Sequence, residues 1–380
     1  MPDASFFWLF QTEACGSARP RCPETVMSEQ HMSLDGTTKH VAPQADHGEV
    51  AKSVVQRIAQ LRAWLFLAGL LVTFEIWARI DFGGTFIFSS YNWQSVAVFA
   101  VAPLLIAVGQ TFVIISGGID LSTGFIMGLA AVVAAHLTNV AGLYMPLPFA
   151  MLVGIFCAIL AAGVPGVVNG LLISRLKVPP FIGTLGMFGV ARGAAFLLAG
   201  GTTVPVTNSY FAMLGNGRFF GVPYLVIVTA IFVLLMHYVL SQTRFGQHNY
   251  AIGANVQAAR RAGIDIKAHI LRLYVLSAMC AGLGGALYAA RFTAGAAQAG
   301  EPLLLDSVAA VVIGGASLFG GSGSIIGTVA GALVIAVIQY GLVFLDVEPF
   351  WQFIAVGVVI IISVLIDQAQ RRFSGGKQDE

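Results

Sequence analysis

Charged side chains are scarce in this sequence. Asp, Glu, Lys and Arg together make up 10% of the 380 residues, whereas soluble globular domains carry about 25%. Hydrophobic residues make up 57%, and the mean hydropathy is +0.83. Since so few charges cannot keep that much apolar surface in water, the lipid bilayer must act as solvent for most of the chain. The net charge of +2 gives no indication of a nucleic-acid partner.

Cysteine is also rare. Cys15 and Cys22 lie near the N-terminus and Cys157 and Cys280 in apolar runs, so no disulfide framework is indicated, and the last two are typical small buried residues. No His, Cys or carboxylate cluster has the spacing of metal ligands, and no Ser, His and Asp set indicates a nucleophile. We therefore expect no metal and no catalytic residues, which argues against a membrane-embedded enzyme.

The sequence lacks the phosphate-binding loop G-x-x-x-x-G-K-[ST]. Its Gly-rich stretch GGSGS (320–324) has no Lys to reach a phosphate and is typical of a tight turn. We therefore expect no cofactor in this chain, and energy for any active process must come from elsewhere.

Long apolar runs are abundant. A spanning helix needs about 20 mostly apolar residues, and about ten segments qualify, which predicts an all-α polytopic membrane protein. The segments are 62–79, 95–115, 121–138, 147–173, 180–199, 223–241, 271–290, 305–318, 326–344 and 350–367. Within the fourth, AAGVPGVVNG (161–170) is expected either to kink the helix or to end it.

Basic residues near the ends of these segments predict the orientation. With the N-terminus in the cytoplasm, an even number of spans places every basic cluster inside, and the C-terminus is cytoplasmic as well. The inner clusters are Lys52, Arg57 and Arg62; Arg175 and Lys177; Arg244, Arg260, Arg261, Lys267 and Arg272; and Arg371, Arg372 and Lys377. Arg79, Arg218 and Arg291 fall outside, each alone in its loop.

The expected organisation has four parts. They are a cytoplasmic, irregular tail (1–57), a transmembrane domain (58–368), a long cytoplasmic loop within that domain (242–270) and a C-terminal cytoplasmic tail (369–380). Met27 and Met32 offer alternative starts, so we expect residues 1–26 to be dispensable.

The long loop contains a short helix with its own start and stop. In GANVQAARRAGIDIKAH (253–269), Asn255 can cap the first turn, and Gly263 can end the helix in a left-handed conformation. Arg260 and Arg261 lie near its C-terminus, where positive charge suits the helix dipole. These arginines are either an ordinary orientation signal or part of a rigid basic knob, and the cap and the Gly stop favour the knob.

A weak internal repeat links the two halves of the chain. GGIDL (117–121) and GGASL (314–318) each lie between two apolar runs, on the same side in the predicted topology. Interrupted segments at matching places in two halves are a pointer to a transport path.

Several longer stretches occur together in a fixed order. They are SGGIDLSTG (116–124), GVVNGLLISRLKVPPFIGTLG (166–186) followed by RG (192–193), TRFGQHNYAIGANVQAARRAGI (243–264) and AAVVIGGASLFGGSGSIIGTVAGAL (309–333). The set resembles the permease subunits of ribose-type ABC sugar importers, over about residues 60–368. One departure is Leu304, where that family commonly has an acidic residue; the role of that acid is either lost or taken by Asp306, two positions later.

The resemblance implies a function and a set of partners. Such permeases work as a pair with two cytoplasmic ATPase subunits, which bind ATP and Mg, and a periplasmic sugar-binding protein delivers the ligand. The helix 255–263 is then similar to the coupling helix that docks on the ATPase. Its Ala258 and Ala259 would permit close approach, and Arg260 and Arg261 would pair with carboxylates of the partner.

Several residues are candidates for the permease core. Asp120 is expected to be an N-cap, a functional ionisable group or both, and Asn169 is expected to tie helices together. Arg192 is costly in lipid and should face a cavity or an acidic partner, with Glu75 and Asp120 as candidates. The full set is Gly117, Gly118, Asp120, Asn169, Thr184, Arg192, Gly314 and Gly315.

The outer arginines have two interpretations. Arg79, Arg218 and Arg291 either contact acids on the binding protein or anchor helices at the membrane interface. The alternative to an ATP-driven importer is a secondary transporter driven by an ion gradient, with Glu75 and Asp120 as its relay. The sequence leaves open whether the substrate is a pentose, a hexose, inositol or a furanose derivative, and whether the second permease is identical or a paralogue.

Overall fold

The computed structural model describes residues 47–348 and 350–375. The described residues from Val50 onward form one compact unit. Most of the predicted N-terminal tail (1–46) lies outside the described residues.

The ends of the described chain are helical. The first helix begins at His47, so the last part of the predicted N-terminal tail belongs to it. The last helix ends at Gly375, and the remainder of the predicted C-terminal tail lies outside the described residues.

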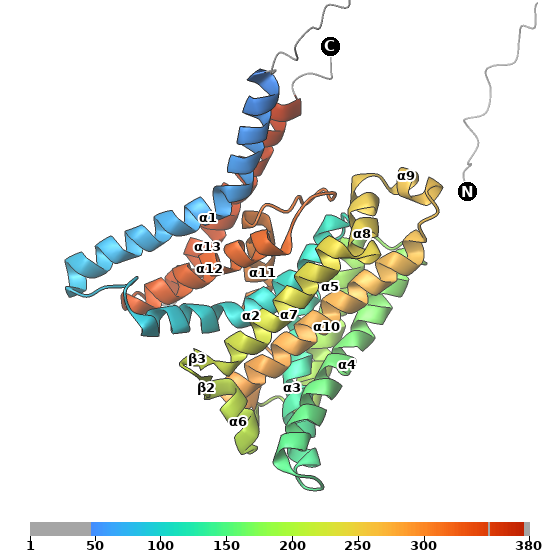
Figure 1. Cartoon of the computed structure of the whole chain (residues 1–380). Coiled ribbons are helices and arrows are strands. Elements are labelled where there is room, and N and C mark those ends of the chain that lie inside the picture. Colours follow the sequence, from blue (N-terminus) through green and yellow to red (C-terminus); the bar gives the residue numbers. More distant parts are fainter. Residues whose placement is uncertain (1–46, 349, 376–380) are drawn as a thin grey trace, which may run out of the picture. The chain divides into compact units, whose positions relative to one another are not determined.

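Helices dominate the structure (Figure 1). They are α1 His47–Phe82, α2 Ser90–Ile115, α3 Thr123–Ala141, α4 Leu147–Ser174, α5 Pro180–Ala199, α6 Ser209–Asn216, α7 Tyr224–Gln242, α8 Arg244–Ala254, α9 Val256–Arg261, α10 Ile266–Phe292, α11 Glu301–Ile313, α12 Ile325–Phe344 and α13 Phe350–Gly375. The short strands form two antiparallel pairs: β1 Val204–Pro205 with β4 Ala294–Gly295, and β2 Arg218–Phe219 with β3 Val222–Pro223.

The length and composition of the helices fit a membrane-spanning protein. Among the described residues, 8 helices are long and apolar enough to cross a bilayer, namely the Ala63–Phe82 part of α1, and α2, α3, α4, α5, α7, α10 and α12. Helix α11 has 13 residues, and the apolar part of α13, Phe350–Ile362, is also short. Each predicted segment overlaps one of these helices, so the prediction of an all-α polytopic protein is confirmed.

Helix α2 lies between two groups of helices. On one side α10 packs against α2, α3 and α4, and α5 packs against α3. Small residues allow this close approach: a side chain at Gly285 of α10 would collide with the Met127 carbonyl of α3, and one at Gly109 of α2 would lie 2.9 Å from the Ser277 Cα atom. Small residues are typical of helix contacts in membranes, where close packing replaces the hydrophobic effect.

The second group lies on the other side of α2 and contains α1, α11, α12 and α13. Helices α11 and α12 pack against each other and against α2, and α13 packs against both. Apolar side chains of α1, including Leu67 and Phe74, share a buried cluster with Val334 and Val337 of α12. Figure 1 shows these helices together, apart from α3, α4 and α10.

Helix α4 continues through the stretch 161–170. Pro165 lies inside the helix, so the alternative in which this stretch ends the helix is wrong. Side chains at Gly166 and Gly170 would press on backbone atoms of α10, at Tyr274, Val275 and Leu271. The Gly and Pro residues of this stretch therefore serve helix packing.

Candidate functional site

Three segments meet at the end of the molecule that carries α9, here called the α9 end. The Gly321 N–H donates to the Ile115 carbonyl at the end of α2, at 2.8 Å. From α8, Asn249 Nδ2 donates to the Phe112 carbonyl (2.9 Å), and the Tyr250 hydroxyl donates to the Gly323 carbonyl (2.7 Å). Burial raises the pKa of the Tyr250 phenol, so this hydroxyl keeps the proton that it donates.

The weak sequence repeat therefore has a spatial counterpart. The turn after α2 contains GGIDL, and the turn after α11 contains GGASL and continues to Gly321. Gly320 and Gly321 have φ of +88° and +79°, which only glycine adopts readily. Both turns adjoin α8, so the loop 242–270 is bonded directly to the ends of α2 and of the α11–α12 turn.

Helix α9 has the predicted cap and stop. Asn255 Oδ1 accepts hydrogen bonds from the Gln257 and Ala258 N–H groups, each at 2.9 Å. Gly263 has φ of +83°, its N–H donates to the Arg260 carbonyl, and the Ile264 N–H donates to the Ala259 carbonyl. This pair of bonds is a Schellman motif. The local prediction is confirmed: the helix is a short element fixed at both ends.

The exposure of α9 side chains corrects one detail. Ala258, Arg260 and Arg261 are exposed, but Ala259 is buried and clusters with Ile252 and Ile266. Ala259 was expected to let a partner approach closely. It instead faces its own chain, because a six-residue helix must turn one face inward to pack.

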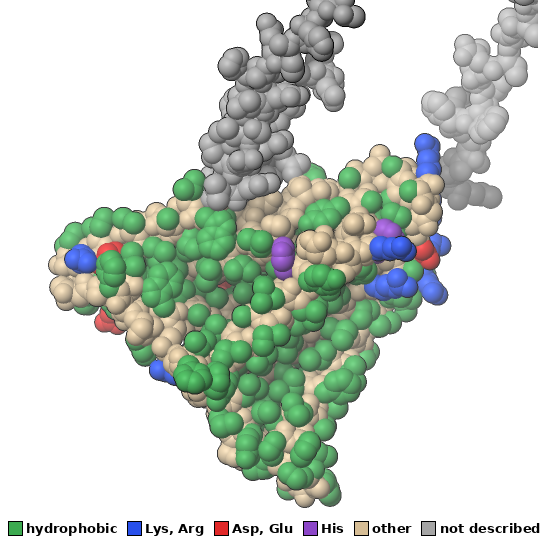
Figure 2. Space-filling view, in the orientation of Figure 1, with side chains coloured by type: hydrophobic (Ala, Val, Ile, Leu, Met, Phe, Trp, Pro, Cys, Tyr) green, Lys and Arg blue, Asp and Glu red, His purple; other side chains and the backbone are tan. Residues whose placement is uncertain are grey.

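Basic side chains gather around α9. Figure 2 shows Lys and Arg grouped at this end of a face that is otherwise mainly hydrophobic. The exposed basic residues of this loop and the start of α10, here called the basic patch, are Arg244, Arg260, Arg261, Lys267 and Arg272. Asp265 is the acidic residue among them, and it caps α10 by accepting from the Ala268 N–H. The patch is therefore suited to an acidic partner surface.

Asp120 lies in a fully buried polar cluster between α2, α3 and α4. Its Oδ1 accepts from both the N–H and the hydroxyl of Ser122, which forms an Asx turn. Helix α3 begins at Thr123 with Ser122 in the capping position, so Asp120 shapes the turn and is not itself the N-cap. Gln110 Nε2 donates to the Asp120 carbonyl. Gly117, with φ of +81°, and Gly118 form the tight turn before it.

Asn169 connects α4 to this cluster. Its Nδ2 donates to the Ser122 hydroxyl at 2.8 Å, and its Oδ1 has no hydrogen-bond partner among the described residues. Thr184, by contrast, bonds only to carbonyls of its own helix, Pro180 and Phe181. Thr184 and Asn169 therefore do not share a polar network in this structure.

Arg192 has neither of the carboxylate partners considered for it. Glu75 Oε1 accepts from Arg79 at 2.6 Å, and Glu75 also accepts from Thr85 and from backbone N–H groups. Asp120 is bonded to Ser122. Arg192 instead lies over the Phe125 ring, 5.2 Å from its centroid, and is exposed. Neither Glu75 nor Asp120 is therefore the partner of Arg192 in this structure.

The remaining predicted residues lie at separate places. Gly314 packs against the backbone of Gly327 in α12, and Gly315, with φ of +90°, turns the chain out of α11. Arg79 is paired with Glu75, Arg218 is exposed on the β2–β3 hairpin, and Arg291 is half-buried.

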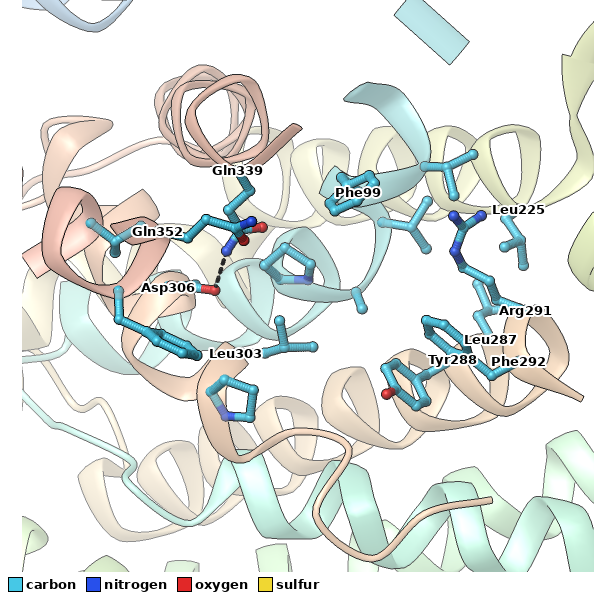
Figure 3. Close-up of a pocket in the computed structure, with 17 residues that line it drawn as sticks. Phe99, Leu225, Leu287, Tyr288, Arg291, Phe292, Leu303, Asp306, Gln339 and Gln352 are labelled. Atoms are coloured by element: carbon cyan, nitrogen blue, oxygen red, sulfur yellow. Dashed lines mark hydrogen bonds between the residues drawn. The ribbon is translucent and has the colours of Figure 1, made fainter. Parts of the chain in front are cut away.

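Arg291 lines a cavity that the sequence did not reveal. The cavity has a volume of about 360 Å³ and lies between α2, α7, α10, α11, α12 and α13. Its walls are mainly apolar, with Asp306, Gln339 and Gln352 as polar side chains across from Arg291 (Figure 3). The sequence did contain one signal for this cavity: Gln and Asp side chains are costly within apolar spans, so their presence there indicates a polar site. Sequence reasoning considered Asp306 only as a replacement for the acid missing at Leu304.

Helices of spanning length around a buried α2, with a cavity among them and a short basic helix at one end, are features of a multi-pass membrane transport protein. Comparison with known proteins is more specific. Residues 92–364 match the family described as "Branched-chain amino acid transport system / permease component", and the chain belongs to this family.

Curated relatives agree over most of the chain. It is 40% identical over 266 residues to the ribose import permease protein RbsC of Bacillus subtilis, covering 70% of this chain and 80% of the relative. It is 34% identical over 301 residues to the fructose import permease protein FrcC of Rhizobium meliloti (76% and 81%). It is 35% identical over 292 residues to the galactose/methyl galactoside import permease protein MglC of Haemophilus influenzae (73% and 86%).

The resemblance inferred from the sequence is therefore confirmed. The chain is a permease component of the ABC importer class, a transport subunit rather than an enzyme. With its apolar helices, it is a multi-pass protein of the bacterial inner membrane.

Proposed function

We propose that this chain forms the translocation path for a monosaccharide or a similar small polyol in an ATP-driven importer. The observation that carries the proposal is the similarity over most of the chain to import permeases named for ribose, fructose and galactose. In the proposed orientation both termini and the α9 end face the cytoplasm. A periplasmic binding protein delivers the sugar, and a second permease, identical or paralogous, completes the path.

The α9 end supports a coupling role. In this proposal α9 docks on a cytoplasmic ATPase subunit, which binds ATP and Mg, and the basic patch pairs with acidic side chains there. Because α8 is hydrogen-bonded to the end of α2 and to the α11–α12 turn, a push on α9 reaches α2 and the group that contains α11 and α12. The ATPase thereby shifts the population between inward-open and outward-open states.

The outer arginines differ in their suitability for docking the binding protein. Arg218 is exposed on a hairpin and free to meet a carboxylate. Arg79 is already paired with Glu75, and Arg291 points into the cavity. We therefore assign docking first to Arg218.

The structure gives little support to an ion-gradient mechanism. Glu75 and Asp120, the two acids considered as a relay, have separate sets of partners. The Glu75 carboxylate accepts hydrogen bonds from Arg79 and from backbone N–H groups of the loop after α1, so its role is to hold that loop against the helix.

Reconstitution tests the proposal directly. The tagged chain is placed in liposomes with and without its co-purified ATPase and binding protein, and uptake of radiolabelled ribose, fructose and galactose is measured. We expect uptake of at least one sugar only when the ATPase, the binding protein and ATP are present. Uptake by this chain alone would show a secondary transporter and would overturn the proposal.

A further inference from the structure

The cavity shown in Figure 3 lies where the two helix groups meet. Helices α2 and α10, with Leu225 of α7, form one wall, and α11, α12 and α13 form the other. Its volume of about 360 Å³ is in the range of sites for small organic ligands, roughly 300–1,000 Å³. Any movement of one helix group against the other changes this space, so a ligand held here would sense the conformational state of the permease.

One pole of the cavity is rich in hydrogen-bonding oxygen and nitrogen. Asp306 is 6% exposed, and its Oδ2 accepts from Gln339 Nε2 at 2.7 Å. Gln352 lies beside this pair in Figure 3. No Lys, Arg or His among the described residues pairs with Asp306. A carboxylate buried without a cation is costly unless other donors satisfy it.

The other pole carries a guanidinium group. Arg291 is half-buried and lies over the Phe292 ring, 5.8 Å from the centroid, with no carboxylate in ion-pair range among the described residues. Figure 3 shows Arg291 across the cavity from Asp306, with Tyr288 and Phe99 along the space between them. The cavity thus has acceptors at one end, donors at the other and aromatic faces between.

This combination suits a polyhydroxylated ring. A carboxylate and side-chain amides accept from and donate to hydroxyl groups, a guanidinium donates several hydrogen bonds, and aromatic faces cover the apolar C–H surface of the ring. A zwitterionic amino acid also matches two opposite charges, but it would leave the amides of Gln339 and Gln352 without a use. The sugar names of the relatives favour the polyol.

We propose that Asp306, Gln339 and Gln352, with Arg291 opposite, bind the hydroxyl groups of the transported sugar within a single permease. This inference rests on the proposed function and deepens it. It places a sugar-binding site within one permease subunit, separate from any path that forms between two permeases.

The test compares two substitutions on one helix. Ala102 of α2 lines this cavity, whereas Ala97 of α2 lines a separate apolar groove beside α7 and α12. In cells that express the complete importer, Ala102→Trp should lower uptake of radiolabelled ribose, fructose or galactose about tenfold or more, and Ala97→Trp should change it less than about threefold. Asp306→Leu should lower uptake about tenfold, with a smaller loss for Asp306→Asn. Membrane levels and detergent size-exclusion profiles control for folding.

A second measurement does not depend on folding of a bulky variant. Gln352→Cys is reacted with N-ethylmaleimide in membranes, with and without the sugar that the wild type takes up, and the adduct is located by mass spectrometry. The sugar should slow this reaction about threefold or more and leave Val233→Cys, in the other groove, unaffected.

The outcomes separate the two proposals. Normal sugar uptake by Ala102→Trp and Asp306→Leu, with no protection of Gln352→Cys, would overturn the cavity assignment and leave the sugar importer intact. A wild type that takes up leucine and none of the three sugars would instead overturn the proposed function and the ligand class together.

Discussion

Asn169 is fully buried, and its amide ties α4 to the turn ahead of α3. The sequence predicted a polar tie at this residue, because an unbonded amide in an apolar span is costly. It did not identify Ser122 as the partner, since that contact depends on how α4 crosses α3. Arg192 shows the opposite case: its cost in lipid was foreseen, but its position over Phe125 was not, because that contact depends on how α5 packs against α3.

Loss of the Asn169 amide should destabilise the protein. Asn169→Leu leaves the Ser122 hydroxyl without its donor, and we expect a loss of about 1–3 kcal/mol. Thr184→Val is the matched control, because the buried Thr184 hydroxyl bonds only within its own helix. Thermal unfolding in detergent measures both. Equal midpoints for the two variants would show that the tie contributes nothing.

Adjacent glycines on α10 should respond differently to the same substitution. A methyl group at Gly285 would collide with the α3 backbone, whereas at Gly284 its nearest neighbour would lie 3.6 Å away. Gly285→Ala should cost about 1–3 kcal/mol and Gly284→Ala much less. The melting temperatures of the purified variants check this, and a more stable Gly285→Ala would contradict the packing described for α3 and α10.

At the scale of elements, the sequence located the helices well and the cavity not at all. Long apolar runs mark spans because backbone groups must be satisfied within lipid, and Asn255 and Gly263 mark α9 because capping chemistry is local. The cavity depends on which faces of α12 and α13 meet α11. Gln339 and Gln352 are 13 residues apart across a loop, and only tertiary packing brings both to Asp306.

Reversal of charge on α9 should uncouple ATP hydrolysis from transport. Arg260→Glu with Arg261→Glu places like charges against the acidic surface expected on the ATPase, and ATP-driven uptake should fall about tenfold or more. Lys267→Glu, in the basic patch but outside α9, should have a smaller effect. Unchanged uptake by the double variant, at normal membrane levels, would remove the coupling role.

The stop of α9 should matter as much as its charge. Gly263 has φ of +83°, and forcing valine into this conformation costs about 1–2 kcal/mol. Gly263→Val should therefore loosen the Schellman motif and lower coupled uptake, whereas Ala262→Val, next to it at a φ of −76°, should be tolerated. Identical uptake by the two variants would contradict the need for a fixed helix end.

At the scale of the whole molecule, α2 joins two helix groups, and the α9 end touches both. The proposed orientation places this end in the cytoplasm and the β2–β3 hairpin outside. In the sequence, only the distribution of Lys and Arg carries that information, because the apolar helices read the same in either direction.

Cysteine labelling should establish the orientation. Phe220→Cys, at a position 92% exposed in the β2–β3 turn, should react with a membrane-impermeant maleimide in intact spheroplasts. Ala258→Cys on α9 should react only in inside-out vesicles. Labelling of Ala258→Cys in intact spheroplasts would invert the topology and exclude contact with a cytoplasmic ATPase.

The two side-chain hydrogen bonds that tie α8 to its neighbours, from Asn249 and Tyr250, both end on main-chain carbonyls, those of Phe112 and Gly323. A main-chain carbonyl is present whatever side chain its residue carries, so substitutions at the accepting residues preserve these bonds. The outward-facing residues of α9 can change independently of them. Replacing the 6 residues of α9 with those of a paralogue should therefore couple the permease to that paralogue's ATPase and leave the transported sugar unchanged.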